Sequence, residues 1–258
     1  ALSQSGMGEM FRSSDLAQNK ILPDMRENIK CGNSLIGSDF YADKNLLDFC
    51  MEEQRKVNAF DWEKEFPQVF TDGGSLPLAK AKASFATPSA GTPRNAPKKT
   101  RAGGFDCVIG NPPYVSVELM SNEDKDYYKA HYEGFIKRCD LFGIFINKAI
   151  KNLVAEGGFV SFIVPSVVHS NLSYQKIRDI LLENRWLNEV CYTGGKVFKG
   201  VTVDTTVLVC RKTEQTHITL KDASDFDNPK TRTVVSDYFA SKNMALSSQT
   251  VFFYKAAG

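Results

Sequence analysis

No stretch of the 258-residue sequence approaches the ~18 consecutive apolar residues that a membrane-spanning helix needs. Residues 1–11 also lack the apolar core of a signal peptide. Hydrophobic residues make up 42% of the chain and charged residues 24%, which is typical of ordinary globular proteins and not of fibrous or disordered ones. We therefore expect a globular protein of the cytoplasm that has no membrane partner.

Metal-binding patterns are also scarce. The six cysteines form no CxxC pair, and the three histidines lie far apart in the sequence. Neither a zinc site nor a pair of nucleophile and base can be read from such spacing. The sequence therefore predicts no metal cofactor.

The net charge is only +2, which argues against a uniformly basic surface for DNA. The charge is uneven, however, because the stretch 71–102 holds six basic residues and one acidic residue, so its net charge is +5 and that of the remainder is −3. Residues 71–104 are rich in small and turn-forming residues and exceed the ~4–6 residues of a usual connection. We interpret 71–104 as a flexible insertion, whose charges favour a solvated loop over an arm that contacts phosphates.

Apolar periodicity predicts alternating helices and strands. Helix-like spacing occurs at 46–60, 125–132, 141–153 and 174–184. Short apolar runs predict strands at Asn28–Cys31, 105–110, 159–164, 187–192 and 205–211. The pair Gly157-Gly158 is expected to end the helix that begins at residue 141. The run 159–164 predicts a strand covered on both faces, and few elements are expected after residue 212. Helices between successive strands predict an α/β fold with a largely parallel sheet.

The sequence Asn111-Pro112-Pro113-Tyr114 directly follows the predicted strand 105–110. Ligands of α/β folds bind in the crevice at the carboxyl ends of the strands, so this position favours a functional site. Two consecutive prolines fix φ and remove two backbone N–H donors. The result is a stiff corner that presents carbonyl oxygens.

Such a corner suits the activation of an exocyclic amine on a nucleobase. The side-chain oxygen of Asn111 and the carbonyl oxygen of Pro112 would accept the two amine hydrogens, which frees the nitrogen lone pair to attack a methyl group on a sulfonium. Tyr114 offers an aromatic face for a flipped base. The alternative interpretation is a proline turn with a capping Asn111 and a packed Tyr114, and these four residues alone leave it open.

Three segments resemble the gamma-class adenine-N6 DNA methyltransferases, in particular those of type IIG restriction–modification enzymes. Gly103–Val115 resembles motif IV of that family, Leu22–Ile36 resembles its motif III, and Phe60–Pro67 resembles the stretch that leads into motif IV. The resemblance covers most of residues 20–212. It implies a Rossmann-like fold, S-adenosyl-L-methionine as the cofactor and a flipped adenine of double-stranded DNA as the target.

The resemblance also implies which residues form the catalytic motif. Asn111 and Pro112 match the acceptors of the target amine. Pro113 completes the corner, and Tyr114 matches the aromatic residue that stacks on the flipped base.

Three further residues receive roles from the same resemblance. Asn33 matches the residue that contacts the adenine of the cofactor. The helix start Asp140-Leu141-Phe142 resembles motif V, which makes Phe142 a second cofactor-binding candidate. The stretch 197–200 resembles motif VIII, in which Phe198 packs on the flipped adenine, although a plain packing role suits Phe198 equally well.

The sequence departs from the family pattern upstream of the motif III segment, where it has neither a glycine-rich motif I nor an acidic motif II. We therefore expect the fold to be incomplete on its N-terminal side. Residues 1–212 would form a partial catalytic domain, and 213–258 a linker with the start of a target-recognition domain. Such a unit is expected to bind the cofactor weakly or not at all and to be inactive alone, and its parent protein could also carry a restriction nuclease.

Two other functions stay open. Methylation of another amine, such as an RNA base or a protein glutamine, would use the same chemistry. A non-catalytic DNA-binding fragment would keep the fold without the cofactor. The similarity of the flanking segments favours DNA as the substrate, and the intact motif favours catalysis.

Overall fold

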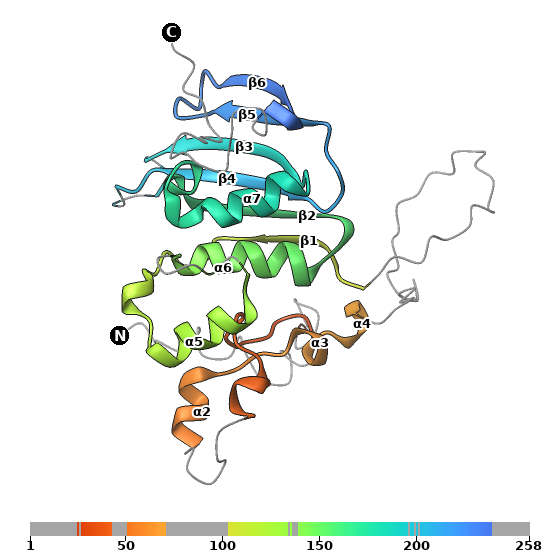
Figure 1. Ribbon diagram of the computed structural model, residues 1–258, viewed down its shortest axis with the longest axis vertical. Coiled ribbons are helices and arrows are strands. Elements are labelled where there is room, and N and C mark those ends of the chain that lie inside the picture. Colours follow the sequence, from red (N-terminus) through yellow and green to blue (C-terminus); the bar gives the residue numbers. More distant parts are fainter. Residues whose placement is uncertain are drawn as a thin grey trace, which may run out of the picture.

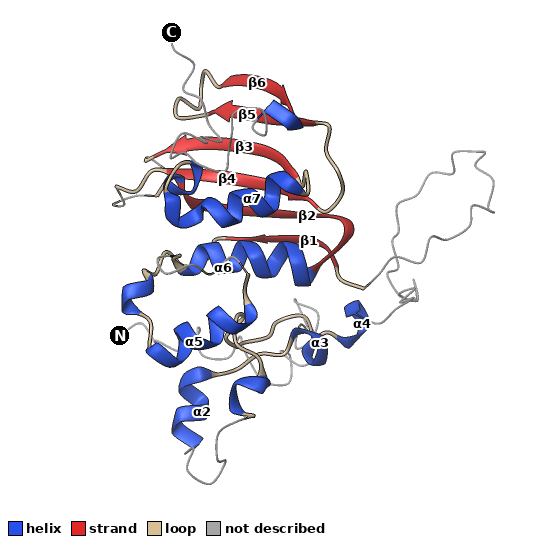
Figure 2. Ribbon diagram, in the orientation of Figure 1, coloured by secondary structure: helices blue, strands red, loops and turns tan. Residues whose placement is uncertain are grey.

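A six-stranded β-sheet is the main element of the computed structural model and occupies the upper part of Figure 1. The residues that the structure describes are 25, 27–42, 51–70, 103–133, 135, 139–195, 197–198, 200 and 202–238. The strands follow one another in the order β1-β2-β4-β3-β5-β6 and appear as one sheet in Figure 2. Their bounds are β1 Phe105–Gly110, β2 Val154–Pro165, β3 Leu187–Gly194, β4 Thr205–Arg211, β5 His217–Asp222 and β6 Lys230–Val235.

The sheet is mixed, which corrects the expectation of a largely parallel sheet. Only the pairs β1/β2 and β3/β5 are parallel, whereas β2/β4, β3/β4 and β5/β6 are antiparallel. The reason is that β4 follows β3 without an intervening helix and folds back between β2 and β3. In the same way β6 folds back on β5. A chain reversal without a helical crossover gives an antiparallel pair.

Helices pack on the sheet and beside its β1 edge, so the α/β prediction is confirmed (Figure 1). The helices α6 and α7 lie on the same face of the sheet, and the shorter elements before β1, together with α5, lie beside β1. The helical bounds are η1 Ser38–Tyr41, α2 Met51–Val57, α3 Trp62–Glu65, α4 Pro67–Phe70, η2 Val117–Leu119, α5 Asn122–His131, α6 Leu141–Lys148, η3 Ala149–Leu153, η4 Ser166–His169, η5 Leu172–Tyr174, α7 Gln175–Glu183 and η6 Ser236–Tyr238. None of these helices is long and apolar enough to cross a membrane.

The predicted helix 141–153 is confirmed, but it ends differently from the prediction. An α-helical part, α6, passes into one π-helical turn, η3, and β2 begins at Val154. Gly157 and Gly158 therefore lie inside a strand. The β1/β2 register jumps there, since Phe105 pairs with Val154 and Cys107 pairs with Phe159. The glycines accommodate this irregularity: a Cβ on Gly158 would lie 2.9 Å from the Asp106 carbonyl oxygen.

The strand β2 is buried mainly on one face. Val160, Phe162 and Val164 are buried beneath α6 and α7, whereas Phe159 on the other face is 37% exposed. The prediction that both faces are covered was therefore wrong within the part of the chain that the structure describes. A run of apolar residues does not by itself tell how many layers cover it.

The segment before the insertion contains no regular strand in its described part. The predicted strand at Asn28–Cys31 was wrong: the amides of Asn28 and Ile29 both donate to the Met25 carbonyl oxygen in a turn. One isolated bridge joins Asn33 to Ala59. The helix expected at 46–60 corresponds to α2 in its described part, and Asn58 ends it with a φ of 48°.

The two ends of the long insertion lie side by side. The Gly104 amide donates to the Val69 carbonyl oxygen at 2.8 Å, and a Cβ on Gly103 would lie 2.5 Å from the Phe70 carbonyl oxygen. The insertion thus leaves the fold and returns to it at one place. Residues 71–102, on which its predicted flexibility depends, lie outside the described residues.

The sheet continues beyond the boundary predicted at residue 212. Both β5 and β6 belong to it, so the expectation of few elements was wrong for residues 217–235. The apolar pattern is weak there because β6 is an edge strand with mostly exposed side chains, and edge strands tolerate charged residues. Residues 239–258 lie outside the described part of the chain.

Candidate active site

The Asn-Pro-Pro-Tyr corner lies at the carboxyl end of β1, as the sequence predicts. β1 pairs with β2 up to Gly110, which lies opposite Phe162. The Phe162 ring fits against Gly110 closely enough that a Cβ there would lie 3.3 Å from it. The strand pairing then stops, because Pro112 and Pro113 have no N–H to donate. Asn111 is exposed at this edge, whereas Pro112 is buried.

A cavity of about 270 Å³ opens beside the corner. Asn111, Pro112 and Pro113 form part of its wall. No hydrogen bond engages the Asn111 side chain within the described residues, so its carboxamide is available to a ligand. The other lining residues come from the segment before the insertion, from β1 and β2 and from α6 and η3: Ser34, Trp62, Val108, Ile109, Gly110, Phe145, Lys148, Ala149, Leu153 and Phe162.

Tyr114 is half-buried and turns its hydroxyl away from solvent. The phenol donates a hydrogen bond to the Ile163 carbonyl oxygen at 3.2 Å. The ring packs edge-on against Phe142, with 6.2 Å between the ring centroids. Burial raises the pKa of the Tyr114 phenol. One polar contact and one aromatic contact therefore fix the position of this ring.

Phe142 lies inside the protein. It is 1% exposed and sits between the rings of Tyr114 and Tyr174, with 4.7 Å between the Phe142 and Tyr174 centroids. In this structure Phe142 therefore has almost no exposed surface with which it could contact a cofactor directly. Any influence of Phe142 on a cofactor would pass through Tyr114.

Asn33 organises the turn that approaches the corner. Its side-chain oxygen accepts a hydrogen bond from the Leu35 amide at 3.1 Å. The next residue, Ser34, lines the cavity, and its carbonyl oxygen accepts from the Trp62 indole at 3.0 Å. The structure thus brings the Asn33 turn to the cavity through Ser34.

Phe198 lies in the connection between β3 and β4, at the same edge of the sheet as Asn111. The strand register shows this, because Thr205 at the start of β4 pairs with both Pro165 and Gly194, the last residues of β2 and β3. Phe198 is half-buried. Its contact with a flipped base remains a prediction.

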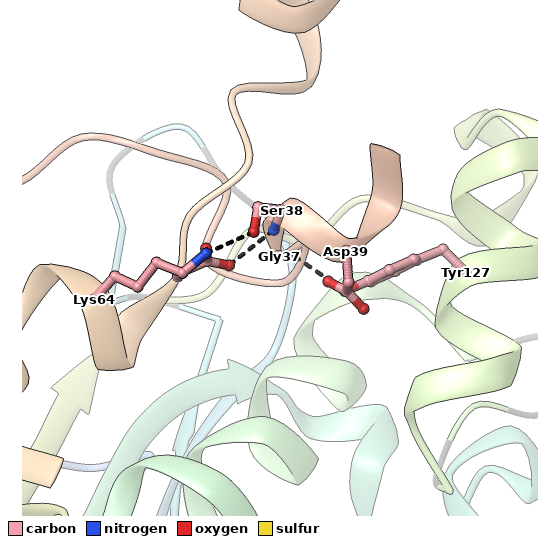
Figure 3. Close-up of polar contacts among 6 residues, drawn as sticks. Gly37, Ser38, Asp39, Lys64 and Tyr127 are labelled. Atoms are coloured by element: carbon pink, nitrogen blue, oxygen red, sulfur yellow. Dashed lines mark hydrogen bonds and ion pairs between the residues drawn. The ribbon is translucent and has the colours of Figure 1, made fainter. Parts of the chain in front are cut away.

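A second, more polar cavity of about 360 Å³ adjoins the first. Polar contacts around it join η1, α3 and α5 (Figure 3). The Lys64 ammonium donates to the Ser38 hydroxyl at 2.9 Å, and the Tyr127 phenol donates to the Asp39 carboxylate at 2.9 Å. These contacts hold the Asn33 turn against the segments on either side of the corner.

Asp61 is the centre of the contacts around Lys64. It accepts from the Ser38 amide at 2.8 Å and forms an ion pair with Lys64. Burial alone would raise its pKa, but the hydrogen bonds from Lys64 and Ser38 outweigh burial and lower the pKa to about 2. Asp61 therefore stays ionised in all but strong acid.

Lys148 is a residue of the site that the sequence did not reveal. It lines both cavities, and its ammonium lies 5.8 Å from the centroid of the Tyr132 ring. Burial lowers its pKa. In the sequence Lys148 looks like a solvated residue near a helix end, and only the position of the Asn33 turn and of α3 makes it a cavity residue.

A sequence model of the Eco57I restriction-modification methylase family matches residues 10–198. That match covers well over half of the chain. The chain therefore belongs to the Eco57I restriction-modification methylase family. The family assignment agrees with the resemblance of the three sequence segments and with an open corner at the end of β1.

Relatives of this Eco57I family member include two proteins named as type II enzymes. The type II restriction enzyme and methyltransferase RM.Eco57I of Escherichia coli is 31% identical over 132 residues, which are 50% of this chain and 13% of that protein. The type II methyltransferase M.TthHB8I of Thermus thermophilus is 35% identical over 116 residues, which are 42% of this chain and 26% of that protein. The chain thus spans only a small part of the length of these relatives.

Among solved structures, the type IIG restriction endonuclease BpuSI is similar to this Eco57I family member over 53% of this chain and 20% of that chain. The sequence identity is 18% and the TM-score is 0.43.

Proposed function

We propose that the chain is the catalytic region of a DNA adenine-N6 methyltransferase in a restriction–modification enzyme. The observation that carries the proposal is the exposed carboxamide of Asn111, which stands at the end of β1 beside an open cavity. Membership of a restriction-modification methylase family supports methyl transfer, and relatives named as type II restriction enzyme and methyltransferase support a role in restriction–modification. Double-stranded DNA as the substrate is part of the proposal. A cytoplasmic location is part of the same proposal.

The corner would act by polarising the target amine. The Asn111 side-chain oxygen and the Pro112 carbonyl oxygen would each accept one amine hydrogen, which makes the nitrogen lone pair more available. The two prolines offer no N–H that could compete for that lone pair. Because Asn111 and its neighbours include no strong base, the corner orients and polarises the amine and does not deprotonate it beforehand.

The wall of the cavity is largely apolar and carries few polar groups. Trp62, Phe145 and Pro113 form apolar wall, and among the described lining residues Lys148 alone is charged. S-adenosyl-L-methionine is a polar ligand, but the flat face of its adenine would lie against this apolar wall, and when bound it supplies an electrophilic methyl group. Ser34 and the turn that Asn33 holds would contact it, while Phe142 would act only by supporting Tyr114.

The flipped adenine would lie between aromatic side chains at the edge of the sheet. Tyr114 would stack on it, because its ring is held in place from behind by Phe142 and by the Ile163 carbonyl oxygen. Phe198 would pack on it from the connection between β3 and β4. Stacking of this kind contributes about 1–3 kcal/mol per base.

Methyl transfer from tritiated S-adenosyl-L-methionine to duplex DNA tests the proposal. The assay uses the protein as it is encoded, because the chain spans only part of the length of its relatives. We expect label on adenine N6, and we expect Asn111→Ala to abolish it while the matched exposed variant Asn122→Ala retains it. Label on cytosine, on RNA or on protein, or an active Asn111→Ala variant, would overturn the proposal.

We also propose that residues 1–258 alone bind the cofactor weakly and are inactive. Within the described sheet β1 pairs only with β2 and forms an edge, and its apolar residue Ile109 is 80% exposed. A strand that is paired on one side only positions a ligand in the neighbouring cavity less firmly than a strand that is paired on both sides. Calorimetric titration with S-adenosyl-L-methionine tests this expectation, and sub-micromolar binding would contradict it.

A further inference from the structure

Asp140 stands at the N-terminus of α6 but does not cap that helix. An aspartate in this position usually accepts a hydrogen bond from an amide of the first helical turn. Here no such bond forms, although the backbone of Asp140 is extended as in a normal cap. Both carboxylate oxygens are engaged elsewhere. One accepts from the Val117 amide at 3.2 Å, and the other accepts from the Tyr174 phenol.

The two partners of Asp140 flank the candidate site. Val117 follows Tyr114 by three residues, and Tyr174 ends the connection that leaves β2 at the same edge of the sheet as Asn111. A further bond runs from the Leu141 amide to the Val115 carbonyl oxygen at 3.1 Å. The start of α6 is thereby tied to the chain just downstream of the corner.

The corner depends on such anchors because its two prolines donate no backbone hydrogen bonds. Pro112 and Pro113 have no amide hydrogen, so neither can donate a backbone hydrogen bond to β2 or to a helix. Upstream, pairing of Gly110 with Phe162 holds the chain. Downstream, three hydrogen bonds hold the chain, and they involve the Tyr114 phenol, the Val115 carbonyl and the Val117 amide. Of these three bonds, the one from the Val117 amide has a charged acceptor. Bonds to charged groups are stronger than neutral ones.

We propose that Asp140 is the positioning residue of the Asn111–Tyr114 corner: its carboxylate clamps Val117 and Tyr174 together and so fixes where the Asn111 oxygen points. The aromatic residues reinforce the clamp. Tyr174 packs on Phe142 and Phe142 packs on Tyr114, so the Tyr174 ring is joined to the corner both through Asp140 and through the core. The importance of this clamp for catalysis rests on the proposed methyl transfer, whereas the existence of the clamp does not.

Hydrogen exchange of the chain without ligand tests the clamp. We expect Asp140→Ala to speed exchange of the Val117 and Leu141 amides about ten- to a hundred-fold, as the loss of a bond to a charged acceptor does. Exchange in the β2/β4 ladder should not change. Asp140→Asn should restore slow exchange at Val117, since its amide oxygen can accept from Val117 while its NH2 donates to the Tyr174 oxygen. Tyr174→Phe should loosen the β2–α7 connection and leave Val117 protected.

The outcomes separate the clamp from a general structural role and from the proposed function. Equal acceleration throughout the sheet, or an Asp140→Asn variant as fast as Asp140→Ala at Val117, would overturn the clamp. In the methylation assay we expect Asp140→Ala to lower kcat more than tenfold with little change in KM for DNA, and Asp140→Asn to recover most of it. An unchanged kcat would overturn the catalytic significance. If the unaltered protein methylates nothing, the proposed function fails, and the exchange experiment still decides the clamp.

Discussion

The Tyr114 phenol donates a hydrogen bond to the Ile163 carbonyl oxygen across 3.2 Å, although 49 residues separate the two in sequence. This bond ties the residue after the diproline corner to β2, the strand beside β1. It gives the aromatic ring a fixed position that packing against Phe142 alone would not define. A ring that is to receive a flipped base benefits from such preorganisation.

Replacing Tyr114 by Phe should lower the free energy of unfolding by about 1 kcal/mol, because one partly buried hydrogen bond is lost and the ring stays. Tyr132→Phe is the matched comparison. The Tyr132 phenol donates to the Leu35 carbonyl oxygen in a fully buried place, so its loss should cost more, about 1–3 kcal/mol. Urea unfolding of both variants measures the difference, and a larger cost for Tyr114→Phe would contradict the assigned burial.

The location of the corner could be predicted from sequence for a specific physical reason. The run 105–110 is largely apolar, and two prolines follow it after Asn111. Because prolines cannot continue a central strand, the sequence predicts where β1 ends. The strands β3 and β4 have the same advantage of short apolar runs with clear limits. By contrast, β6 has mostly exposed side chains and no apolar pattern to detect.

The contacts around the corner could not be predicted in the same way. The resemblance made Phe142 a candidate to touch a cofactor. Helical spacing indicates that the Phe142 ring is covered, but it does not tell whether a ligand or the rings of Tyr114 and Tyr174 cover it. Lys148 lines both cavities only because segments far away in sequence, around Ser34 and Trp62, form other parts of the cavity walls. Such long-range contacts depend on the tertiary fold and leave no local pattern.

Phe142→Ala should destabilise the chain strongly in the absence of any cofactor. The side chain is 1% exposed, and truncation leaves a cavity between Tyr114 and Tyr174, at a cost of about 3–5 kcal/mol. Phe145→Ala, on the same helix but half-buried at the cavity wall, should cost less. Denaturant midpoints without ligand make the comparison. If Phe142→Ala were no worse than Phe145→Ala, Phe142 would not be the packing residue described above.

Arg178→Lys should weaken the connection between β2 and α7. One guanidinium nitrogen of Arg178 donates to the Val168 carbonyl oxygen at 2.9 Å and to the Asn171 carbonyl oxygen at 2.8 Å, and the side chain is 1% exposed. A lysine keeps the charge, but its shorter side chain does not bring a nitrogen to the place from which Arg178 donates both bonds, so we expect a loss of about 1.5–3 kcal/mol. Arg185→Lys is the control, because Arg185 pairs with Glu214 and Asp237 at the surface and should cost little. Equal melting temperatures for the two variants would refute the assignment.

His169 should make the chain less stable as the pH falls from 6.5 towards 4. Burial, reinforced by the charge of Arg178, lowers the pKa of His169 from 6.5 to about 4. The unfolded chain therefore takes up a proton at His169 below pH 6.5, whereas the folded chain does not until about pH 4. Stability contributed by the neutral ring is present above pH 6.5 and is lost progressively across that interval, by roughly 3 kcal/mol in total.

Unfolding measured between pH 7 and pH 4.5 checks the His169 prediction, since most carboxylates remain ionised in that range. His169→Gln should remove most of the slope of the unfolding free energy against pH, and His217→Gln, at an exposed position in β5, should leave it unchanged. The imidazole proton resonance of His169 in the unaltered chain gives an independent reading that does not depend on how the variants fold. A midpoint near pH 6.5 for that resonance would show that the ring is hydrated, and the predicted loss of stability would then have no source.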